Sequence, residues 1–407
     1  MAHSFQRYIL DIQPEILVIS HKFPPSIGGM QKHCYELVEG ISKKTKVHRL
    51  IQTEGISKIG FFLTVVTKAR RILKANPNIS LIYVNDGLMA FVLSKLLKHT
   101  KVPMVATIHG LDVVFPMKFY QNWVRNKLAR YAGIIAVSEA TESECLDRGL
   151  ERGRVFMVKN GFEPEAMEKR DLSHIREKLK SDYQVNLDGK KVIVSIGRGV
   201  KRKGFSWFIR NVVKNLPEDV CYLMIGPSAN TKQIRLLRSI LPASLFEKIV
   251  LFAGLAVDDV EIEAAIKELC LDDRVKRISG LKYSELNDLV RFADISVMPN
   301  LSIPGDFEGF GLVALEAVSN GTLCIAAGIE GITTAIEDGK NGVLLESRNP
   351  EIWRNKIESF LDKPDELIVL SRQYQKYNLE HSFSWSQMVD AYYDIFVKIA
   401  GQKTMSE

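Results

Sequence analysis

Short apolar runs alternate with amphipathic stretches along the whole chain. Each run is rich in β-branched side chains, and longer stretches with helical spacing, such as 31–42 and 61–75, lie between them. Such runs predict buried strands, and their alternation with helices predicts a parallel sheet covered by helices on both faces. The predicted strands are 15–20, 81–84, 104–108, 133–138 and 154–158, followed by 191–197, 221–226, 275–280, 295–299, 323–327 and 342–346.

A polar, charged stretch at about 168–190 interrupts this alternation, and the pattern restarts after it. The predicted fold class is therefore α/β, with two Rossmann-like domains whose parallel sheets face each other across a cleft. We expect the domains to cover 1–165 and 166–385, followed by an amphipathic terminal helix in 386–407. Ligands of such sheets bind beyond the carboxyl ends of the strands, so functional residues are expected there.

The cysteines and the apolar runs predict the cellular environment. Five cysteines are scattered along the 407 residues without a CxxC pair, which predicts free thiols in a reducing cytoplasm and no zinc site. No apolar run approaches the roughly 18 residues of a membrane-spanning helix. The first residues do not resemble a signal peptide, because Arg7 is soon followed by Asp11 and Glu15.

Charge is distributed unevenly. Residues 1–132 contain 19 Lys and Arg against 7 Asp and Glu, a net charge of +12, and because the whole chain carries +7 the remainder carries −5. This asymmetry indicates an anionic partner, either nucleic acid or a lipid surface. Within it, 113–132 interleaves basic and aromatic residues and contains no acid. Such a segment suits a helix in a membrane interface, but also a helix that buries its aromatic side chains in its own domain and exposes only its charges. The residues concerned are Lys118, Arg125, Lys127 and Arg130 with Phe115, Phe119, Tyr120 and Trp123.

Two strand ends in the first series carry candidate site residues. Gly28 and Gly29 follow strand 15–20 in "HKFPPSIGGMQKH" and open a helix, where backbone N–H groups can approach a phosphate. A Gly pair is equally typical of a plain turn between a strand and a helix. His109 closes strand 104–108 in "ATIHGLDVV", where it is either a structural or a ligand-contacting residue.

The loop "SIGRGVKRKGF", residues 195–205, follows the first strand of the second series. Its glycine spacing, Gly197-x-Gly199-x4-Gly204, is not that of the dinucleotide fingerprint. It instead places Arg198 and Lys203, with further basic residues between them, at the end of a strand. Because arginine and lysine bind phosphate oxygens, this loop predicts an anion site, although a charge run is usually only a solvated loop.

Two glutamates mark a third candidate site. Glu308 lies in a glycine-rich loop, and Glu316 lies inside the apolar helical run that begins near Gly311 and ends at Asn320–Gly321. A buried carboxylate is costly unless it is hydrogen-bonded, and two vicinal sugar hydroxyls would supply the donors. Glu316 is then either a buried carboxylate that accepts hydrogen bonds from such hydroxyls or a glutamate at the helix edge that faces water.

These pieces, in this order, resemble the retaining glycosyltransferases of family 4, which have the GT-B fold. The resemblance covers nearly the whole chain. Its most specific part is the E-x7-E motif, Glu308 to Glu316 in "EGFGLVALEA", and Asn160–Gly161 resembles the family's interdomain signature. The other shared features are the Gly-Gly loop, the histidine at a strand end, and the Arg-x4-Lys pair of Arg198 and Lys203.

The resemblance implies a role for each residue. Arg198 and Lys203 would hold the donor diphosphate, and Glu308 the transferred sugar, while His109 would contact the sugar or the acceptor. Glu316 would hold the ribose and is expected to be buried for that reason. The residues implied to be catalytic are Arg198, Lys203, Glu308 and His109, and those implied to bind the donor are Gly28, Gly29, Gly197, Gly309, Phe310, Gly311 and Glu316.

The resemblance further implies a UDP- or GDP-linked sugar donor, no cofactor, and a saccharide or lipid-linked acceptor used in cell-envelope polysaccharide or glycolipid synthesis. No D-x-D triplet occurs, which fits a metal-independent enzyme that uses cations and helix dipoles. A lipid-linked acceptor favours peripheral attachment to an anionic membrane on its cytoplasmic face. The terminal helix is implied to cross back onto the first domain.

Two departures and several alternatives accompany this interpretation. The interdomain signature reads "NGFE" at 160–163, and an extended segment at about 228–270 leaves the nucleotide base undetermined. An epimerase or phosphorylase on the same fold, a basic nucleic-acid-binding protein, and a sugar-binding module without turnover are the alternatives. No pattern specific to any of them is seen in the sequence.

Overall fold

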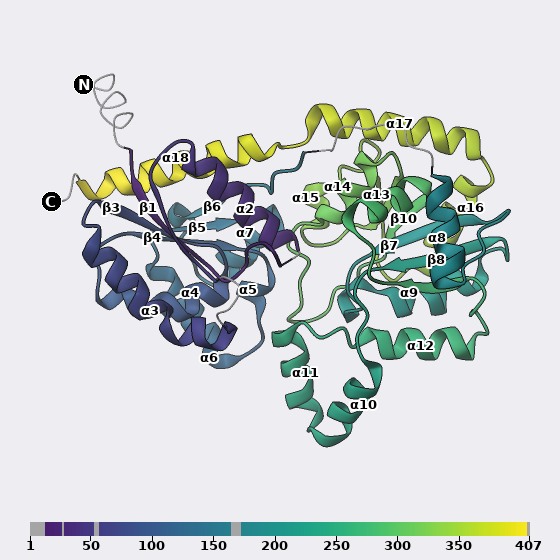
Figure 1. Cartoon of the computed structure of the whole chain (residues 1–407), viewed down its shortest axis with the longest axis horizontal. Coiled ribbons are helices and arrows are strands. Elements are labelled where there is room, and N and C mark those ends of the chain that lie inside the picture. The colour runs from purple at the N-terminus through teal and green to yellow at the C-terminus, as the bar shows by residue number, and fades with distance from the viewer. Residues whose placement is uncertain (1–12, 27, 53–56, 164–171, 405–407) are drawn as a thin grey trace. The chain divides into compact units, whose positions relative to one another are not determined.

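The chain folds into two compact units. The computed structural model describes residues 13–26, 28–52, 57–163 and 172–404, and Figure 1 shows its helices and strands. The first unit consists of Met1–Glu163 together with Phe383–Glu407, and the second consists of Pro164–Ser382. Each unit carries one six-stranded sheet in which all strands run parallel. The α/β fold with two parallel sheets is thereby confirmed.

The first sheet has the strand order β2-β1-β3-β4-β5-β6. Its strands are β1 (Glu15–Ser20), β2 (Val47–Ile51), β3 (Ile79–Val84), β4 (Met104–Ile108), β5 (Gly133–Ala136) and β6 (Val155–Met157). The helices of this unit are α2 (Gly29–Ser42), α3 (Lys58–Ala75), α4 (Gly87–Leu93), α5 (Leu111–Val114), α6 (Lys118–Asn126), α7 (Glu139–Asp147) and α18 (Trp385–Thr404). In Figure 1, α2 and α18 lie on one side of this sheet, and α3 and α4 lie on the other.

The second sheet has the strand order β12-β11-β10-β7-β8-β9. Its strands are β7 (Lys191–Ile196), β8 (Val220–Ile225), β9 (Val275–Ile278), β10 (Ile295–Met298), β11 (Leu323–Ala327) and β12 (Val343–Leu345). The helices of this unit are α8 (Ser173–Tyr183), α9 (Phe205–Asn211), α10 (Thr231–Ile240), α11 (Ala243–Ala253), α12 (Asp258–Glu268), α13 (Tyr283–Phe292), α14 (Leu312–Ser319), α15 (Ile332–Ala335), α16 (Pro350–Leu361) and α17 (Pro364–His381).

Every predicted strand is present, and one strand was missed. β2 lies at the edge of the first sheet, where His48 is only partly buried and Arg49 is exposed. An edge strand need not be apolar along its whole length, so "VHRLI" lacks the continuous apolar run that identifies the buried strands. The central strands β1 and β3 are almost wholly buried, as their sequences predict.

The terminal helix α18 belongs to the core of the first unit. Its apolar side chains, among them Met388, Tyr392 and Phe396, join residues of β1, β3 and α2 in one buried cluster. Gly40 on α2 allows the two helices to approach closely, because a Cβ at this position would lie 2.4 Å from a methyl carbon of Val389. The chain therefore returns to the first unit after completing the second.

The aromatic residues of 113–132 do not form a membrane-facing stripe. Tyr120 and Trp123 on α6 are buried against each other and against Phe91, and Phe115 is buried as well. Only Phe119 among the aromatics of this segment is largely exposed. The interpretation that the aromatic residues of this helix insert into a membrane interface is thus wrong, because Phe115, Tyr120 and Trp123 pack inside the first unit. Across the described ranges, no helix combines the length and the apolarity needed to cross a membrane.

Candidate functional site

The second sheet has a switch point between β7 and β10. The chain adds β8 and β9 on one side of β7 and then returns to add β10 on the other. The loops that leave two such strands diverge and create a crevice at their carboxyl ends, which is where open α/β sheets bind ligands. Ser195 Oγ donates a hydrogen bond to the Val297 carbonyl oxygen at 2.8 Å and joins the two strands just before these loops.

Lys203 and Glu308 meet at this switch point. Lys203 follows β7, Glu308 follows β10, and the Lys203 Nζ lies 2.7 Å from the Glu308 Oε2. Asn300 Nδ2 donates to the same oxygen at 3.0 Å, and the Arg202 guanidinium also binds it. Arg202 reaches Asp306 as well, with its Nε 3.1 Å from Oδ1. The side chains of Lys203 and Glu308 are only 9% and 14% exposed, so this is a largely desolvated charge cluster.

Gly204 sets the turn that delivers Lys203. Its φ of 68° lies in the left-handed region, and a Cβ at this position would stand 2.0 Å from the Pro299 carbonyl oxygen. The loops after β7 and β10 therefore touch backbone to backbone here, which requires glycine. This contact explains the last glycine in the spacing Gly197-x-Gly199-x4-Gly204.

The charges of the cluster stabilise one another. Burial disfavours the ionised form of Glu308, but Arg202 and Lys203 outweigh it and hold the pKa of this carboxyl at about 2. Burial lowers the pKa of Lys203, an effect that the positive charge of Arg202 reinforces and that Glu308 opposes. Glu308 is thus a permanent carboxylate that holds a cation beside the strand ends.

Glu330 is a member of the cluster that the sequence did not reveal. It lies between β11 and α15, and its Oε2 accepts a hydrogen bond from the backbone N–H of Glu308 at 2.6 Å. The N–H of Gly331 donates to the Glu308 carbonyl oxygen at 3.0 Å, so this loop holds both sides of the Glu308 main chain. Glu330 has a φ of 53°, a conformation that is strained for a residue other than glycine. Burial, and then the charge of Glu308, raise its pKa to about 7.

Arg198 lies on the same turn but has a different partner. Its Nη1 donates to the carbonyl oxygen of Gly254, the residue that caps α11, at 2.8 Å. Burial, and then the neighbouring Arg202, lower the pKa of its guanidinium. The adjacent Gly197 is held from the other side, because its carbonyl oxygen accepts a hydrogen bond from Arg277 Nη2 at 3.0 Å. Arg198 and Lys203 thus share one turn, with Lys203 in the Glu308 cluster and Arg198 bonded to the end of a helix.

The expectation that Glu316 is buried is wrong. Glu316 lies on α14 as predicted, but it is only partly buried, whereas its neighbours Leu315 and Ala317 lie in the core. Its position at the edge of the apolar face explains how the helix tolerates a carboxylate. The preceding Gly309–Gly311 segment leads directly into this helix, with Gly311 at φ 96° before its first turn. The partial exposure of Glu316 therefore gives no support to a ribose partner.

In the first unit, His109 stands at the carboxyl end of β4. Its Nε2 lies 2.9 Å from the carbonyl oxygen of Asn85, and its backbone N–H donates to Asp112 Oδ2 at 2.9 Å. The ring packs edge-on against His33. Burial, and then the charge of Asp86, raise the pKa of Asp112. The main chain of Asn85 therefore holds the His109 ring, and the Asp112 side chain holds its backbone.

His33 is a buried histidine behind this site. Its Nδ1 is 3.1 Å from Asn85 Oδ1 and its Nε2 is 3.1 Å from the Tyr392 hydroxyl. Burial, and then the charge of His109, lower the pKa of His33 to about 3, so it is neutral at physiological pH. Tyr392 belongs to α18 and also lies 3.1 Å from the Thr107 hydroxyl, so the terminal helix helps to support the strand end that carries His109.

Gly28 and Gly29 form the start of α2. Gly28 precedes the helix with φ 154°, Gly29 is its first residue, and both are exposed. The fourteen-residue helix therefore begins at exposed residues, and the approach of its first backbone N–H groups to a phosphate stays a prediction. His21, from the same loop, contacts the buried Asp86 at 3.2 Å.

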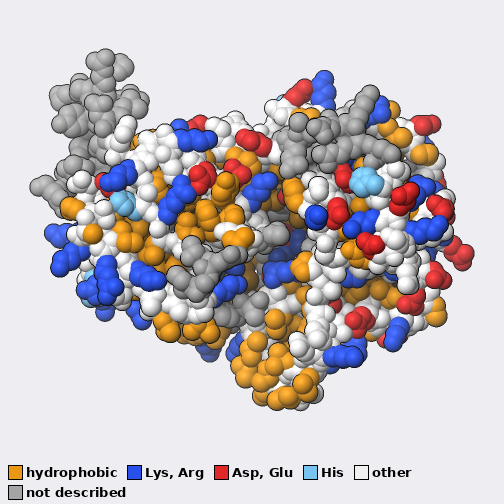
Figure 2. Space-filling model, viewed as in Figure 1, with side chains coloured by type: hydrophobic (Ala, Val, Ile, Leu, Met, Phe, Trp, Pro, Cys, Tyr) orange, Lys and Arg blue, Asp and Glu red, His pale blue; other side chains and the backbone are white. Residues whose placement is uncertain are grey.

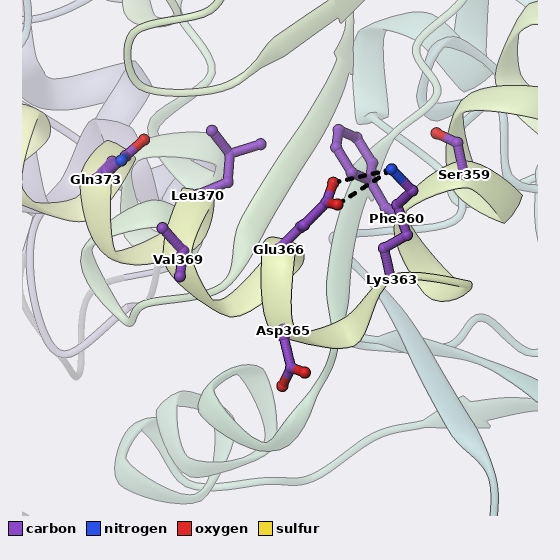
Figure 3. Close-up of a pocket in the computed structure, with 8 residues that line it drawn as sticks. All are labelled: Ser359, Phe360, Lys363, Asp365, Glu366, Val369, Leu370 and Gln373. Carbon is purple, nitrogen blue, oxygen red and sulfur yellow. Dashed lines mark hydrogen bonds and ion pairs between the residues drawn. The ribbon is translucent and has the colours of Figure 1, made fainter.

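A surface cavity of about 450 Å³ lies elsewhere in the second unit, between the end of α16 and the start of α17 (Figure 3). Of its three charged residues, Lys363 and Glu366 pair with each other at 3.1 Å and are both largely exposed. No predicted site residue lines it. Its lining residues are Ser359, Phe360, Lys363, Asp365, Glu366, Val369, Leu370 and Gln373. This cavity is not the site that the sequence indicates.

Comparison with known families gives two matches. Residues 177–381 match the model described as "Glycosyl transferases group 1". Residues 45–166 match the model described as "Glycosyltransferase Family 4". The second-unit cluster lies within the first of these regions, and His109 lies within the second.

A curated relative and two solved structures are similar over much of the chain. The D-inositol 3-phosphate glycosyltransferase of Rhodococcus jostii is 26% identical over 306 residues, which cover 71% of this chain and 60% of the relative. The chain thus spans less than two thirds of that relative's length. HepE of Anabaena, in complex with UDP and glucose, aligns with a TM-score of 0.71 at 17% identity, covering 95% of this chain and all of that one. Sucrose-phosphate synthase of Thermosynechococcus elongatus aligns with a TM-score of 0.72 at 17% identity, covering 96% of this chain and all of that one.

Proposed function

Because this chain belongs to the glycosyl transferases group 1 family, we propose that it moves a sugar from a nucleotide-sugar donor to a saccharide or lipid-linked acceptor with retention of configuration. The family makes the protein a glycosyltransferase with the GT-B fold, and we propose that the sugar it transfers is a hexose. The desolvated Lys203–Glu308 pair at the switch point of the second sheet carries the proposal. It provides a fixed cation and a fixed carboxylate where this fold binds ligands.

The proposed chemistry is electrostatic. Negative charge grows on the departing nucleoside diphosphate as the bond between sugar and phosphate breaks, and cations preorganised in a desolvated site stabilise that charge. Lys203 is the proposed desolvated cation, and Arg198, whose side chain is exposed, is the proposed second cation. The Gly197 turn is proposed to lie against the phosphates. Glu308 orients Lys203 through the 2.7 Å ion pair and, in this proposal, accepts a hydrogen bond from the transferred sugar.

The remaining contacts follow the same assignment. We place the ribose hydroxyls on Glu316 and the sugar beside the backbone N–H groups of Gly309, Phe310 and Gly311. In the first unit, the start of α2 at Gly28 and Gly29 is proposed to approach the phosphates, and His109 to approach the sugar or the acceptor. No cofactor enters this scheme, and the donor is proposed to be UDP- or GDP-linked.

The acceptor is proposed from two observations. The name of the relatives, D-inositol 3-phosphate glycosyltransferase, makes a polyol phosphate one acceptor to test. The excess of basic residues in 1–132 favours an acceptor carried at an anionic membrane, as in cell-envelope glycolipid or polysaccharide synthesis. α3 supports this surface, because Ile59 and Leu63 are exposed near its start and Arg70, Arg71 and Lys74 are exposed farther along it. The protein is then peripheral on the cytoplasmic face of the membrane.

A donor panel tests the proposal. Thermal unfolding is measured with UDP, GDP, ADP and dTDP, and the sugar nucleotides that match any stabilising nucleotide are then assayed for release of the nucleoside diphosphate. We expect one base to stabilise the protein and its sugar nucleotide to be consumed. The anomeric configuration of the product, read by NMR, tests retention separately. Consumption of no donor, together with stabilisation by no nucleotide, would contradict the proposed function.

A further inference from the structure

α10 and α11 form a helical hairpin with a small core of its own. The hairpin is inserted between β8 and α12, within the segment that the sequence marked as extended. Ile234, Phe246 and Val250 pack with Val257 in a buried cluster separate from the main core of the unit. The inward faces of α10 and α11 are therefore buried against each other and against the segment that contains Val257.

The outward face of the hairpin is also apolar. Leu236 and Ile240 lie one turn apart on α10 and are 61% and 68% exposed, and Leu245 on α11 is 45% exposed. Figure 2 shows hydrophobic side chains gathered over this hairpin at the lower edge of the molecule. Scattered exposed leucines are ordinary, but a contiguous group at the tip of a projecting element marks an interaction surface.

The hairpin carries more basic than acidic residues, because α10 and α11 contain one acid, Glu247, which pairs with Lys201. Residues 231–246 contain no Asp or Glu, and Lys232, Arg235 and Arg238 lie on α10 beside the apolar group. Two of these cations are paired with α12, Arg235 with Glu263 at 3.2 Å and Arg238 with Glu261 at 3.7 Å. Lys232, and Lys248 on α11, are exposed and form no ion pair within the part of the chain that the structure describes. The rim of the apolar face thus keeps a positive charge.

We propose that this hairpin docks on an anionic lipid bilayer, with Leu236, Ile240 and Leu245 entering the boundary between headgroups and acyl chains. Apolar side chains beside exposed lysines are the combination that interfacial helices use, and lysine gains from an anionic leaflet. This inference rests on the proposed function for its setting, a membrane-carried acceptor. The hairpin would be a membrane contact in addition to the α3 surface proposed above, and it belongs to the unit that contains Lys203 and Glu308.

The hairpin is bonded to the turn that carries the proposed diphosphate-binding residues. Arg198 donates to the Gly254 carbonyl oxygen at the end of α11, and Lys201 pairs with Glu247 on α11 at 3.0 Å. A variant of the outward face must therefore be checked for an intact donor site. Consumption of donor in the absence of vesicles provides that check, and it also separates a failure of this inference from a failure of the proposed function.

Co-sedimentation of the full chain with vesicles tests the inference. One set of vesicles is phosphatidylcholine alone, and the other contains about one third phosphatidylglycerol. The variant is Leu236→Gln/Ile240→Gln/Leu245→Gln, and the matched control is Ile352→Gln/Ile368→Gln/Leu379→Gln, which changes three exposed apolar residues elsewhere in the same unit. We expect the hairpin variant to lower partitioning onto anionic vesicles by about tenfold or more, and the control to bind like the wild type.

A direct probe is Ile240→Trp with brominated lipids in the anionic vesicles. We expect more fluorescence quenching than in the wild type, because the new indole would lie near the brominated chains, whereas Ile368→Trp should add none. Wild-type binding that is equal on both vesicle types, or an unquenched Ile240→Trp, would overturn the proposal. The proposal would also be overturned if the Ile59→Gln/Leu63→Gln variant no longer bound anionic vesicles while the hairpin variant still bound them. A change from dimer to monomer in the hairpin variant, with vesicle binding unchanged, would assign the face to a second copy of the chain instead.

Discussion

Replacement of Glu330 by glutamine is expected to flatten the pH dependence of stability of the second unit. Glu330 is held against the backbone N–H of Glu308, and glutamine can accept the same hydrogen bond through its amide oxygen. The carboxylate faces Glu308 and Asp306, which raise its pKa, and Arg202, which lowers it. Burial is the largest cause, and the resulting pKa is about 7 against an ordinary value of 4.5.

The sign and size of the effect follow from linkage. Because the folded-state pKa lies above the unfolded value, the native state favours the protonated acid, and its contribution to stability is present below pH 4.5 and lost as the pH rises through about 7. The difference between these pKa values corresponds to about 3.4 kcal/mol at 1.36 kcal/mol per unit. Since the side chain is partly exposed, solvent screening reduces this to about 1–2 kcal/mol. Glutamine stays neutral, so the variant does not lose this stability as the pH rises.

Thermal unfolding followed by intrinsic fluorescence between about pH 5 and pH 8 measures this difference. At pH 5 the variant and the wild type should unfold at nearly the same temperature. At pH 8 the variant should unfold later, by about 2–4 °C for each kcal/mol in a unit of this size. Glu351→Gln, which changes an exposed carboxylate on α16, is the matched control and should show no such divergence. A constant difference between Glu330→Gln and wild type at all pH values would refute the reasoning.

Three further substitutions have defined outcomes. Gly204→Ala should destabilise the second unit by more than about 1 kcal/mol in urea unfolding, because its Cβ would meet the Pro299 carbonyl oxygen at 2.0 Å and its φ is positive; an unchanged midpoint would contradict the tight turn. Tyr392→Phe should cost about 1–3 kcal/mol, because it leaves the buried His33 Nε2 without its hydroxyl partner, and Tyr393→Phe is the control. Glu316→Ala should raise the Kd of the preferred nucleoside diphosphate by about tenfold in calorimetric titration, because ribose contacts act on bound nucleotide and transition state alike; an equal Kd would remove Glu316 from the proposed site.

The fold could be predicted from the sequence because most strands of a buried parallel sheet are continuous runs of apolar residues. Five strands of each sheet carry that signal. The edge strands β2 and β9 do not, since His48 and Arg49 interrupt β2, and Lys276 and Arg277 interrupt β9. The positions of the candidate residues at strand ends followed from the same pattern. Lys203 and Glu308 were each placed after a strand, and both lie where the loops of β7 and β10 come together.

What the sequence did not show depends on contacts between distant segments. Glu330 belongs to the cluster only because the loop after β11 reaches the main chain of Glu308, and no local pattern in "GIEG" reports this. The partial exposure of Glu316 depends on which edge of a short helix faces the core, and periodicity over eight residues does not resolve it. The rings of Tyr120 and Trp123 are buried because Phe91, from another helix, packs on them.

The central claim is that Lys203 stabilises the departing nucleoside diphosphate. Its most direct test is the rate of nucleoside diphosphate release from the identified donor for Lys203→Ala beside Lys201→Ala. Lys201 lies two residues away on the same turn, but it pairs with Glu247 on the surface, whereas Lys203 pairs with Glu308 at the strand ends. We predict a fall of about a hundredfold or more in kcat for Lys203→Ala, as expected for the loss of a preorganised charge, and a rate close to that of the wild type for Lys201→Ala. Equal rates for Lys203→Ala and the wild type would contradict the account.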